Sequence, residues 1–149
     1  RISRRLPANF RQDIRAGIDS MHIADPDQRF EKYLEGRYGP QNDPANRQKA
    51  FLDFFNPEHI RMLHFIVEHS PTNQQQANID ASARWVEKYR NSLNGQERAT
   101  LRTQFQSPEG RAMLQRATAQ YNSQDVYYRG QTAAVISQLL KTVNSVQNP

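Results

Sequence analysis

The sequence contains no cysteine and no long apolar run, and both absences narrow what the protein can be. Without cysteine the chain forms no disulfide, uses no thiol nucleophile and holds no metal through thiolates. No apolar run approaches the length of about 20 residues that a helix needs to cross a bilayer. The motifs HExxH, GxGxxG, GxSxG and the phosphate-binding loop are also missing. These absences favour a non-enzymatic protein and predict no cofactor.

The composition predicts one helical domain with a thin core. The chain has 149 residues, of which 36% are hydrophobic, and its mean hydropathy is −0.92. Phenylalanine, tyrosine and leucine nevertheless recur at helical spacing, and no segment alternates with a period of two. We therefore expect an all-α fold over residues 1–149: a single-domain multi-helix bundle of six to eight helices.

Helix starts are marked by one repeated local device, a capping residue followed by proline. The side chain of Asp, Asn or Ser accepts an N–H group of the first turn, and proline suits the first helical position. The device occurs at Asp25-Pro26, Asp43-Pro44, Asn56-Pro57 and Ser107-Pro108. Asn94 and Glu97 have the spacing of a capping box, which predicts one more helix start.

The densest apolar segment is Phe51–Val67, which Asn56-Pro57 divides into two helices. Ile60, Leu63 and Val67 share one face of the second helix, and Met62, Phe65 and Ile66 cover another. A helix that is apolar on two sides is expected to be buried on two sides. The pattern therefore predicts that Pro57–His69 lies at the centre of the fold.

The first helix is predicted to begin near Pro7 and to bury an apolar stripe at i, i+4 spacing. That stripe consists of Leu6, Phe10, Ile14, Ile18 and Met21. In the next helix, Asp27, Glu31 and Glu35 form an acidic row. This row either faces solvent or pairs with Arg11 and Arg15, if the first two helices pack antiparallel.

The segment after Ser107-Pro108 is too long to be one straight helix. About 38 residues of helix span roughly 57 Å, whereas a domain of this length is roughly 38 Å across. The apolar pattern lapses over residues 122–125, where Ser123 is a candidate cap, and Gly130 adds a weak point. We expect a break or kink near residues 122–125.

The residues LRTQFQSPEGRAML, Leu101–Leu114, contain the motif aromatic-x-Ser-Pro-x-Gly. Phe105, Ser107, Pro108 and Gly110 occupy its positions, and Gln106 stands where a second aromatic residue is usual. Over roughly residues 89–143 the chain resembles a family of uncharacterised bacterial exported helical domains. The resemblance implies an all-helical, exported or periplasmic domain with no assigned activity. Any signal peptide or anchor is expected upstream of Arg1.

The histidines offer one candidate metal site. His59, His64 and His69 are five residues apart, so their rings point about 140° from one another around a helix and do not converge. His64 and Glu68, at i, i+4, would supply two ligands, with others from residues such as His22 or Glu31. A hydrogen-bonded core histidine is the commoner interpretation, and no Glu-x-x-His motif of di-metal bundles occurs.

Basic residues suggest a partner or anion surface. The chain carries a formal charge of +5, with a pI of about 9.8, and the positive charge gathers towards its two ends. Arg84 and Lys88 flank Trp85 and Tyr89, a mixture that suits phosphate contact and base stacking. The alternative is that these two aromatic residues, at i, i+4, are simply a buried face. In the last segment Arg111, Arg116, Arg129 and Lys141 face only one acid, Asp125, between residues 111 and 149.

These observations favour a non-enzymatic interaction or structural domain that binds a protein partner or self-associates. An exported or periplasmic location is favoured over the cytoplasm. The candidate surface comprises Arg84, Lys88, Arg111, Arg116 and Arg129. One alternative is a nucleic-acid or anionic-polymer binding protein that uses its basic termini. A second is a metal-dependent protein centred on His64 and Glu68.

Overall fold

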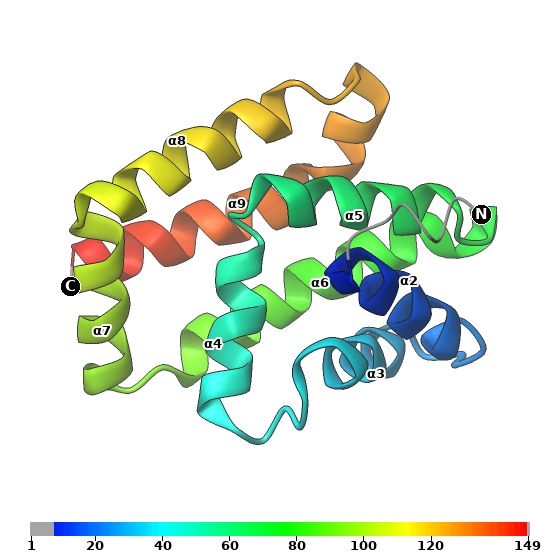
Figure 1. Cartoon of the computed structure of the whole chain (residues 1–149), viewed down its shortest axis with the longest axis horizontal. Coiled ribbons are helices and arrows are strands. Elements are labelled where there is room, and N and C mark those ends of the chain that lie inside the picture. Colours follow the sequence, from blue (N-terminus) through cyan, green and yellow to red (C-terminus); the bar gives the residue numbers. More distant parts are fainter. Residues whose placement is uncertain (1–7, 149) are drawn as a thin grey trace.

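The computed structural model describes residues 8–148, except for the side chain of Asn9, and within that range every regular element is an α-helix. The expected all-α bundle is thereby confirmed, with eight helices in the described range (Figure 1). Leu6 and Pro7 lie outside the described residues. The helices are α2 (Ala8–Ser20), α3 (Pro26–Tyr38), α4 (Pro44–Asp53), α5 (Pro57–Glu68), α6 (Thr72–Ser92), α7 (Gly95–Gln106), α8 (Pro108–Asn122) and α9 (Val126–Gln147).

The capping residues begin the helices as the sequence predicts. Each of the four Asx-Pro or Ser-Pro steps places its side-chain oxygen on a backbone N–H of the first turn and its proline inside that turn. Asn94 and Glu97 form a complete capping box at the start of α7. Because a cap depends only on residues within one turn, sequence alone locates these helix starts.

The centre of the bundle is α6, and the prediction that Pro57–His69 occupies it was wrong. Helix α6 packs against α3, α5 and α9, and it buries six residues between Ile79 and Tyr89. The first half of α5 is buried through His59, Ile60 and Met62, but Phe65 is 37% exposed. The second apolar face of α5 therefore lies at the margin of the core rather than inside it.

An aromatic cluster joins α4, α6 and α7. The ring of Phe51 stacks on Tyr89 at a centroid distance of 4.8 Å and meets the edges of Phe55 and Phe105 at 5.4 and 6.3 Å. Phe51 and Phe105 are fully buried. Trp85 stacks on Tyr89 at 5.4 Å, so the aromatic residues between Arg84 and Arg90 belong to the core. The interpretation of Trp85 and Tyr89 as a buried face is confirmed.

Helix α2 packs with a face different from the one predicted. Asp13, Ala16, Gly17 and Ser20 are buried, whereas Ile18 is 60% exposed. The remaining described members of the predicted stripe are only half-buried. The small residues of α2 allow neighbouring helices to come close to it. A Cβ added at Gly17 would lie 3.1 Å from the side chain of Ile66, and the α3 backbone likewise lies close to Ala16.

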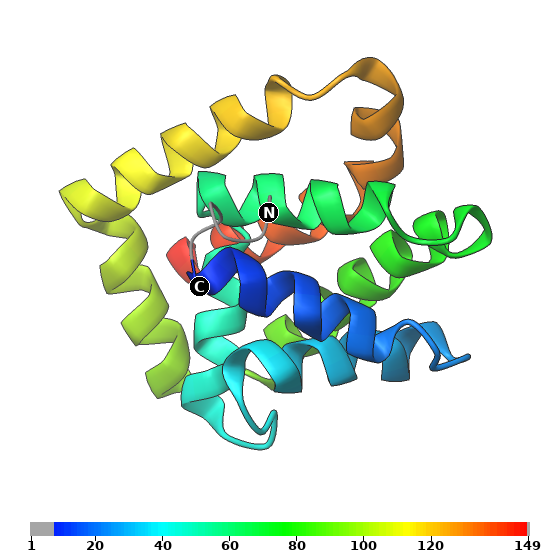
Figure 2. The same ribbon diagram turned by 45° about the vertical axis from the view of Figure 1, so that its right-hand side comes forward.

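Helices α7 and α8 meet at a corner that depends on Gly110 (Figure 2). Ser107 Oγ accepts a hydrogen bond from the Gly110 N–H group at 3.0 Å. A Cβ at position 110 would overlap the carbonyl oxygen of Gln104 and lie 2.8 Å from its carbon. Gly110 is therefore the only residue type that fits, because any side chain would push the two helix backbones apart.

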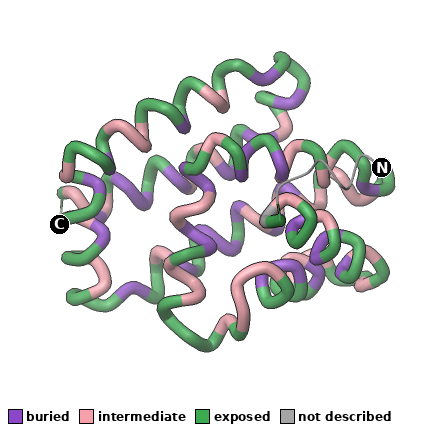
Figure 3. The backbone as a smooth tube through the Cα atoms, viewed as in Figure 1, coloured by how far each residue is buried: buried purple, intermediate pink, exposed green. Residues whose placement is uncertain are grey.

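The predicted break near residues 122–125 is confirmed. Helix α8 ends at Asn122 and α9 begins at Val126, but the cap of α9 is Asp125, whose carboxylate accepts the N–H of Tyr128 at 2.9 Å. Ser123 instead bonds back to the Gln120 carbonyl. Gly130 lies inside a continuous helix. After the break the two helices follow different supports: α8 packs on α7 and α5, and α9 packs on α6 and α7. Only Gly110 and Ala117 of α8 are buried (Figure 3).

Two glycine-to-alanine substitutions test the corner. Gly110→Ala is expected to lower the free energy of unfolding by about 3 kcal/mol, because its Cβ meets backbone atoms that move only if α7 and α8 separate. Gly130→Ala is the control: nothing lies within 4 Å of its added Cβ, so alanine should stabilise α9 by about 0.5–1 kcal/mol. Urea unfolding followed by circular dichroism measures both. Equal effects at the two positions would refute the corner.

Candidate functional site

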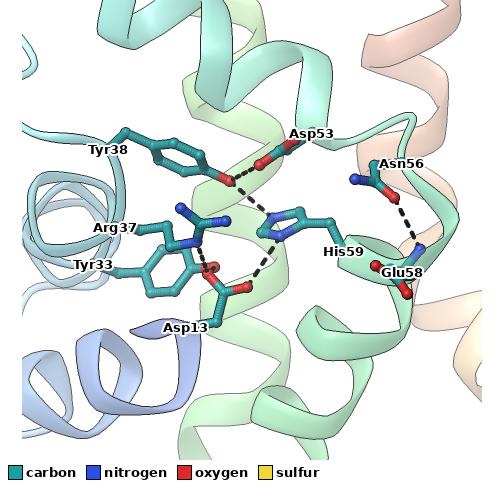
Figure 4. A network of polar contacts seen from close by, with 8 residues as sticks. All are labelled: Asp13, Tyr33, Arg37, Tyr38, Asp53, Asn56, Glu58 and His59. Carbon is teal, nitrogen blue, oxygen red and sulfur yellow. Dashed lines mark hydrogen bonds and ion pairs between the residues drawn. The ribbon is translucent and has the colours of Figure 1, made fainter. Parts of the chain in front are cut away.

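A buried polar network joins helices α2, α3, α4 and α5 (Figure 4). At its centre is Asp13, whose side chain is fully buried. Asp13 Oδ1 accepts a hydrogen bond from the Tyr33 hydroxyl at 3.0 Å and lies 2.7 Å from Arg37 Nε. Asp13 Oδ2 lies 3.3 Å from Nδ1 of the buried His59. Two helices, α3 and α5, therefore supply partners to one carboxylate of α2.

The network continues from His59 through Tyr38 to Asp53. The Tyr38 hydroxyl donates to Asp53 Oδ2 at 2.6 Å and lies 3.3 Å from His59 Nε2. A tyrosine hydroxyl has only one proton. With that proton donated to Asp53, His59 Nε2 is the donor in its contact with Tyr38. His59 therefore links the Tyr38–Asp53 pair to Asp13, which lies 3.3 Å from its Nδ1.

Two of the contacts to Asp13 are ion pairs rather than well-aligned hydrogen bonds. Arg37 Nε, His59 Nδ1 and Asp13 Oδ2 are close in distance but lack a hydrogen bond of good geometry. Their attraction is therefore mainly electrostatic. The Arg37 guanidinium also lies 4.9 Å from the centroid of the Tyr38 ring, in a cation–π arrangement.

The environment keeps the phenols protonated and the guanidinium charged. Burial, reinforced by the charge of Asp13, raises the pKa of Tyr33 well above its usual value. Burial and the neighbouring Asp53 do the same to the pKa of Tyr38. For Arg37, burial lowers the pKa, but the charge of Asp13 raises it and the net direction is upward. Each group therefore keeps the proton that its contact needs.

This arrangement favours a structural role over a catalytic one. Asp13 and His59 are almost completely buried. A cavity of about 90 Å³ lies in the interior of the bundle, and among the described residues of the network only Tyr33 lines it. An acid–base pair needs a substrate within hydrogen-bond reach. Here the polar atoms contact one another, so the network links α2, α3, α4 and α5.

Replacing the central carboxylate should destabilise the fold strongly. Asp13→Asn leaves Arg37 and His59 without a negative partner, and breaking a buried ion pair from one side lowers stability by about 3–5 kcal/mol. The control is Asp27→Asn, which breaks the exposed pair with Arg84, where the two side chains are 42% and 48% exposed. That pair should contribute at most about 1 kcal/mol. Denaturant unfolding of both variants measures the difference, and similar losses would contradict the role given to Asp13.

Five tyrosines have raised pKa values for the same physical reason. Burial raises the pKa of Tyr89 to about 12, with a smaller contribution from Glu97. Burial is also the main cause of the raised pKa of Tyr121 and of Tyr128, as it is for the two tyrosines of the polar network. Above about pH 10 the unfolded chain loses phenol protons that the folded chain keeps, so stability falls as the pH rises.

Alkaline unfolding tests this linkage. Between about pH 10 and about pH 11 each buried tyrosine should remove about 1 kcal/mol of stability, as measured by urea unfolding, because the phenols of the unfolded chain ionise only in part over this range. Phenolate absorbance should appear together with the loss of helix. Tyr128→Phe should reduce the loss of stability with rising pH by the contribution of one tyrosine. Tyr127→Phe, in which the replaced ring is 75% exposed, should leave that loss unchanged. Phenolate absorbance from a fully helical protein would contradict the assignment.

A surface groove of about 460 Å³ lies between α8 and α9. Its apolar lining includes Tyr121 from α8 and Ile136 and Leu140 from α9, and Leu140 is 57% exposed. Arg129 and Lys141 line it as well. These two cations are separated by about 18 Å along the helix axis, at 1.5 Å per residue. The groove thus combines an apolar floor with positive charge towards both ends.

The five cations predicted as a partner or anion surface lie on three helices. Arg84 and Lys88 are exposed on α6, and Arg111 and Arg116 are exposed on α8. Arg129 on α9 is the one that lines the groove. The structure therefore does not gather them into one site, and only one of them joins the groove.

Arg84 is already engaged by the acidic row of α3. Its guanidinium nitrogens lie 2.8 and 2.9 Å from Asp27 Oδ1. The charge and hydrogen bond of Asp27 outweigh burial and raise the pKa of Arg84. Within residues 8–148 no ion pair joins this row to Arg11 or Arg15. The antiparallel pairing considered for the row is therefore replaced by a link from α3 to α6.

Sequence reasoning missed most of the network and the groove floor. The network draws on residues from four helices, and no local pattern in the sequence marks them. The one available signal was Asp13, a carboxylate whose spacing from Ala16 and Ser20 places all three residues on the same face of a helix. The groove had one sequence signal, the pair Leu139-Leu140. Adjacent residues point about 100° apart on a helix, so one of the two faces away from the core.

His64 and Glu68 are in contact, as their spacing predicts. The His64 ring lies against Tyr128 at a centroid distance of 3.8 Å, and its Nδ1 is 3.5 Å from the amide nitrogen of Gln124. The described residues contain no group of three or more side chains placed to hold a metal ion. His59, His64 and His69 each have different partners. A metal site at His64 and Glu68 therefore remains a prediction. Among the described residues no third ligand supports it.

Comparison of the chain with protein-family models, with curated proteins and with solved structures gave no significant match. Within the described residues, no helix is both long enough and apolar enough to cross a membrane.

Proposed function

We propose that this chain is a non-enzymatic interaction domain that binds a partner protein in the α8–α9 groove. The observation that carries the proposal is the groove itself, in which exposed apolar side chains lie between two cations. A sealed polar network and an accessible groove together favour binding over catalysis. The exported or periplasmic location belongs to the same proposal, and its support is the resemblance of Phe105–Gly110 to bacterial exported helical domains.

The apolar lining of the groove supports a protein partner. Leu140 is 57% exposed and lines the groove, and Ile136 and Tyr121 line it as well. An exposed apolar side chain in a groove, with polar residues around it, is typical of an interaction site. Nucleic-acid binding has less support, because Trp85 and Tyr89 are buried and offer no open ring for base stacking.

Charge complementarity defines the partner as an acidic amphipathic helix. Arg129 and Lys141 are exposed, and none of the described residues that line the groove is acidic. A helix laid along α9 presents residues eleven positions apart on one face, about 17 Å from each other, which matches the separation of the cations. If the partner helix carries a carboxylate at each of these two positions, an apolar stripe between them would cover Ile136 and Leu140, as in helix-in-groove complexes.

Binding of designed helical peptides tests the groove. The probe carries a leucine stripe and two glutamates eleven positions apart, and a peptide of scrambled sequence serves as its control. Leu140→Asp should weaken binding at least tenfold, whereas Val126→Asp, at an exposed site outside the groove, should not. Arg129→Glu should weaken binding too, and a peptide with the facing glutamate changed to lysine should restore it.

Three results would overturn parts of this proposal. Equal loss in Leu140→Asp and Val126→Asp would show that the peptide binds elsewhere. Binding of DNA or RNA with a steep salt dependence, unaffected by Leu140→Asp, would favour the anionic-polymer alternative. Concentration-dependent dimers that Leu140→Asp abolishes would make a second copy of the chain the occupant. Protection from protease in spheroplasts, where an exported domain is accessible, would overturn the location.

A further inference from the structure

The interior contains a partly enclosed cavity of about 90 Å³ where six helices meet. Its wall is mainly apolar and includes Phe30, Phe54, Leu63, Ile79 and Val135. Voids larger than a water molecule are few in a well-packed protein interior. Such a void lowers stability, because its lining loses both the transfer free energy and the contacts of absent atoms.

Four hydroxyls of the wall are already satisfied within the protein. The hydroxyls of Ser20, Ser70, Ser82 and Thr132 each bond to a backbone carbonyl of their own helix or its end. A cavity needs two to four polar partners to hold an ordered water molecule. This wall therefore suits an apolar occupant better than water.

The one charged side chain of the wall is fixed in a similar way. Arg29 is 5% exposed, and its Nε donates to Asn78 Oδ1 at 2.7 Å. Its terminal nitrogen donates to the carbonyl oxygens of Ile23 and Ala24 at 2.7 and 3.3 Å. These bonds use the guanidinium to anchor α3 to α6 and to the loop before α3. The cation is thus part of the frame of the cavity.

We infer that this cavity is a binding site for a small apolar molecule, of a size up to one aromatic ring or a short alkyl chain. An apolar cavity in another protein, enlarged by removing a core side chain, stays dry and binds benzene or xenon, which shows that volume and apolar lining are sufficient. A charged ligand is excluded, because the guanidinium of Arg29 is committed and no other charge lines the wall. This inference is independent of the proposed groove function.

Titration with benzene tests the cavity. Benzene should bind saturably, with a dissociation constant of about 1 mM, and should raise the midpoint of thermal unfolding. In methyl NMR spectra the shifts should concentrate on lining residues such as Leu63, Ile79 and Val135. Benzoate, of the same ring size but charged, should produce neither effect. Shifts confined to Leu140 and Val126 at the surface, or no saturable shift, would overturn the inference.

Filling the cavity provides a second test with a matched control. Val67 lines the cavity and is only half-buried, so Val67→Phe is able to enter the space without displacing the tightest part of the core. Benzene affinity should fall at least tenfold in Val67→Phe and should be unchanged in Val126→Phe, which makes the same change at an exposed site. If Val67→Phe fails to fold, Thr132→Ile provides the same test at another wall residue. Unchanged affinity in a folded filling variant would refute the site.

The groove variant separates the two proposals. Leu140 lines the groove and not the cavity, so Leu140→Asp should bind benzene as the unmodified chain does. Loss of benzene binding in Leu140→Asp would place the benzene site in the groove and overturn the cavity. Loss of peptide binding without loss of benzene binding is the expected pattern.

Discussion

The first half of this fold depends on the burial of one carboxylate. A fully buried, unpaired carboxylate is too unfavourable to tolerate, so Asp13 must find partners or be expelled. Its partners come from α3 and α5, and they reach it only when these helices pack against α2 in one arrangement. Tyr38 and Asp53 extend the requirement to α4. Apolar packing alone would allow α2 to rotate or slide, and its small residues offer little side-chain shape to prevent this. The network therefore specifies the packing where the apolar core is thin.

In the second half, the corner between α7 and α8 depends on a steric constraint instead of a charge. The corner at Ser107-Pro108 closes only because Gly110 lets the start of α8 touch the α7 backbone. This contact directs α8 onto α5 and away from α9, which stays on α6. The groove between α8 and α9 follows from that divergence. The aromatic-x-Ser-Pro-x-Gly motif thus has a physical explanation: its serine caps α8, its proline begins the helix and its glycine permits the corner.

The sequence predicted what depends on neighbours along the chain and missed what depends on neighbours in space. Caps at Asp25, Asp43, Asn56 and Ser107 were predictable because they act within one turn. The buried face of α2 was not predictable in this way. Ile18 looks like a core residue in the sequence, but Gly17 and Ala16 bring the neighbouring helices too close for a larger side chain. For the site, the sequence pointed to two cations of the groove, Arg129 and Lys141, but not to its apolar floor. Its floor became visible only once α8 and α9 were placed against different supports.

Tyr121 lines both the interior cavity and the surface groove, so one ring separates the two candidate sites. Its hydroxyl donates to the Phe54 carbonyl at 3.1 Å, which fixes the ring to the junction between α4 and α5. An occupant of either site affects the other only as far as it favours a different position of this ring. Any such coupling is reciprocal, because linkage requires equal effects in both directions. With the hydrogen bond intact, the ring acts as a fixed wall and the two sites bind independently; breaking the bond is the step that would couple them.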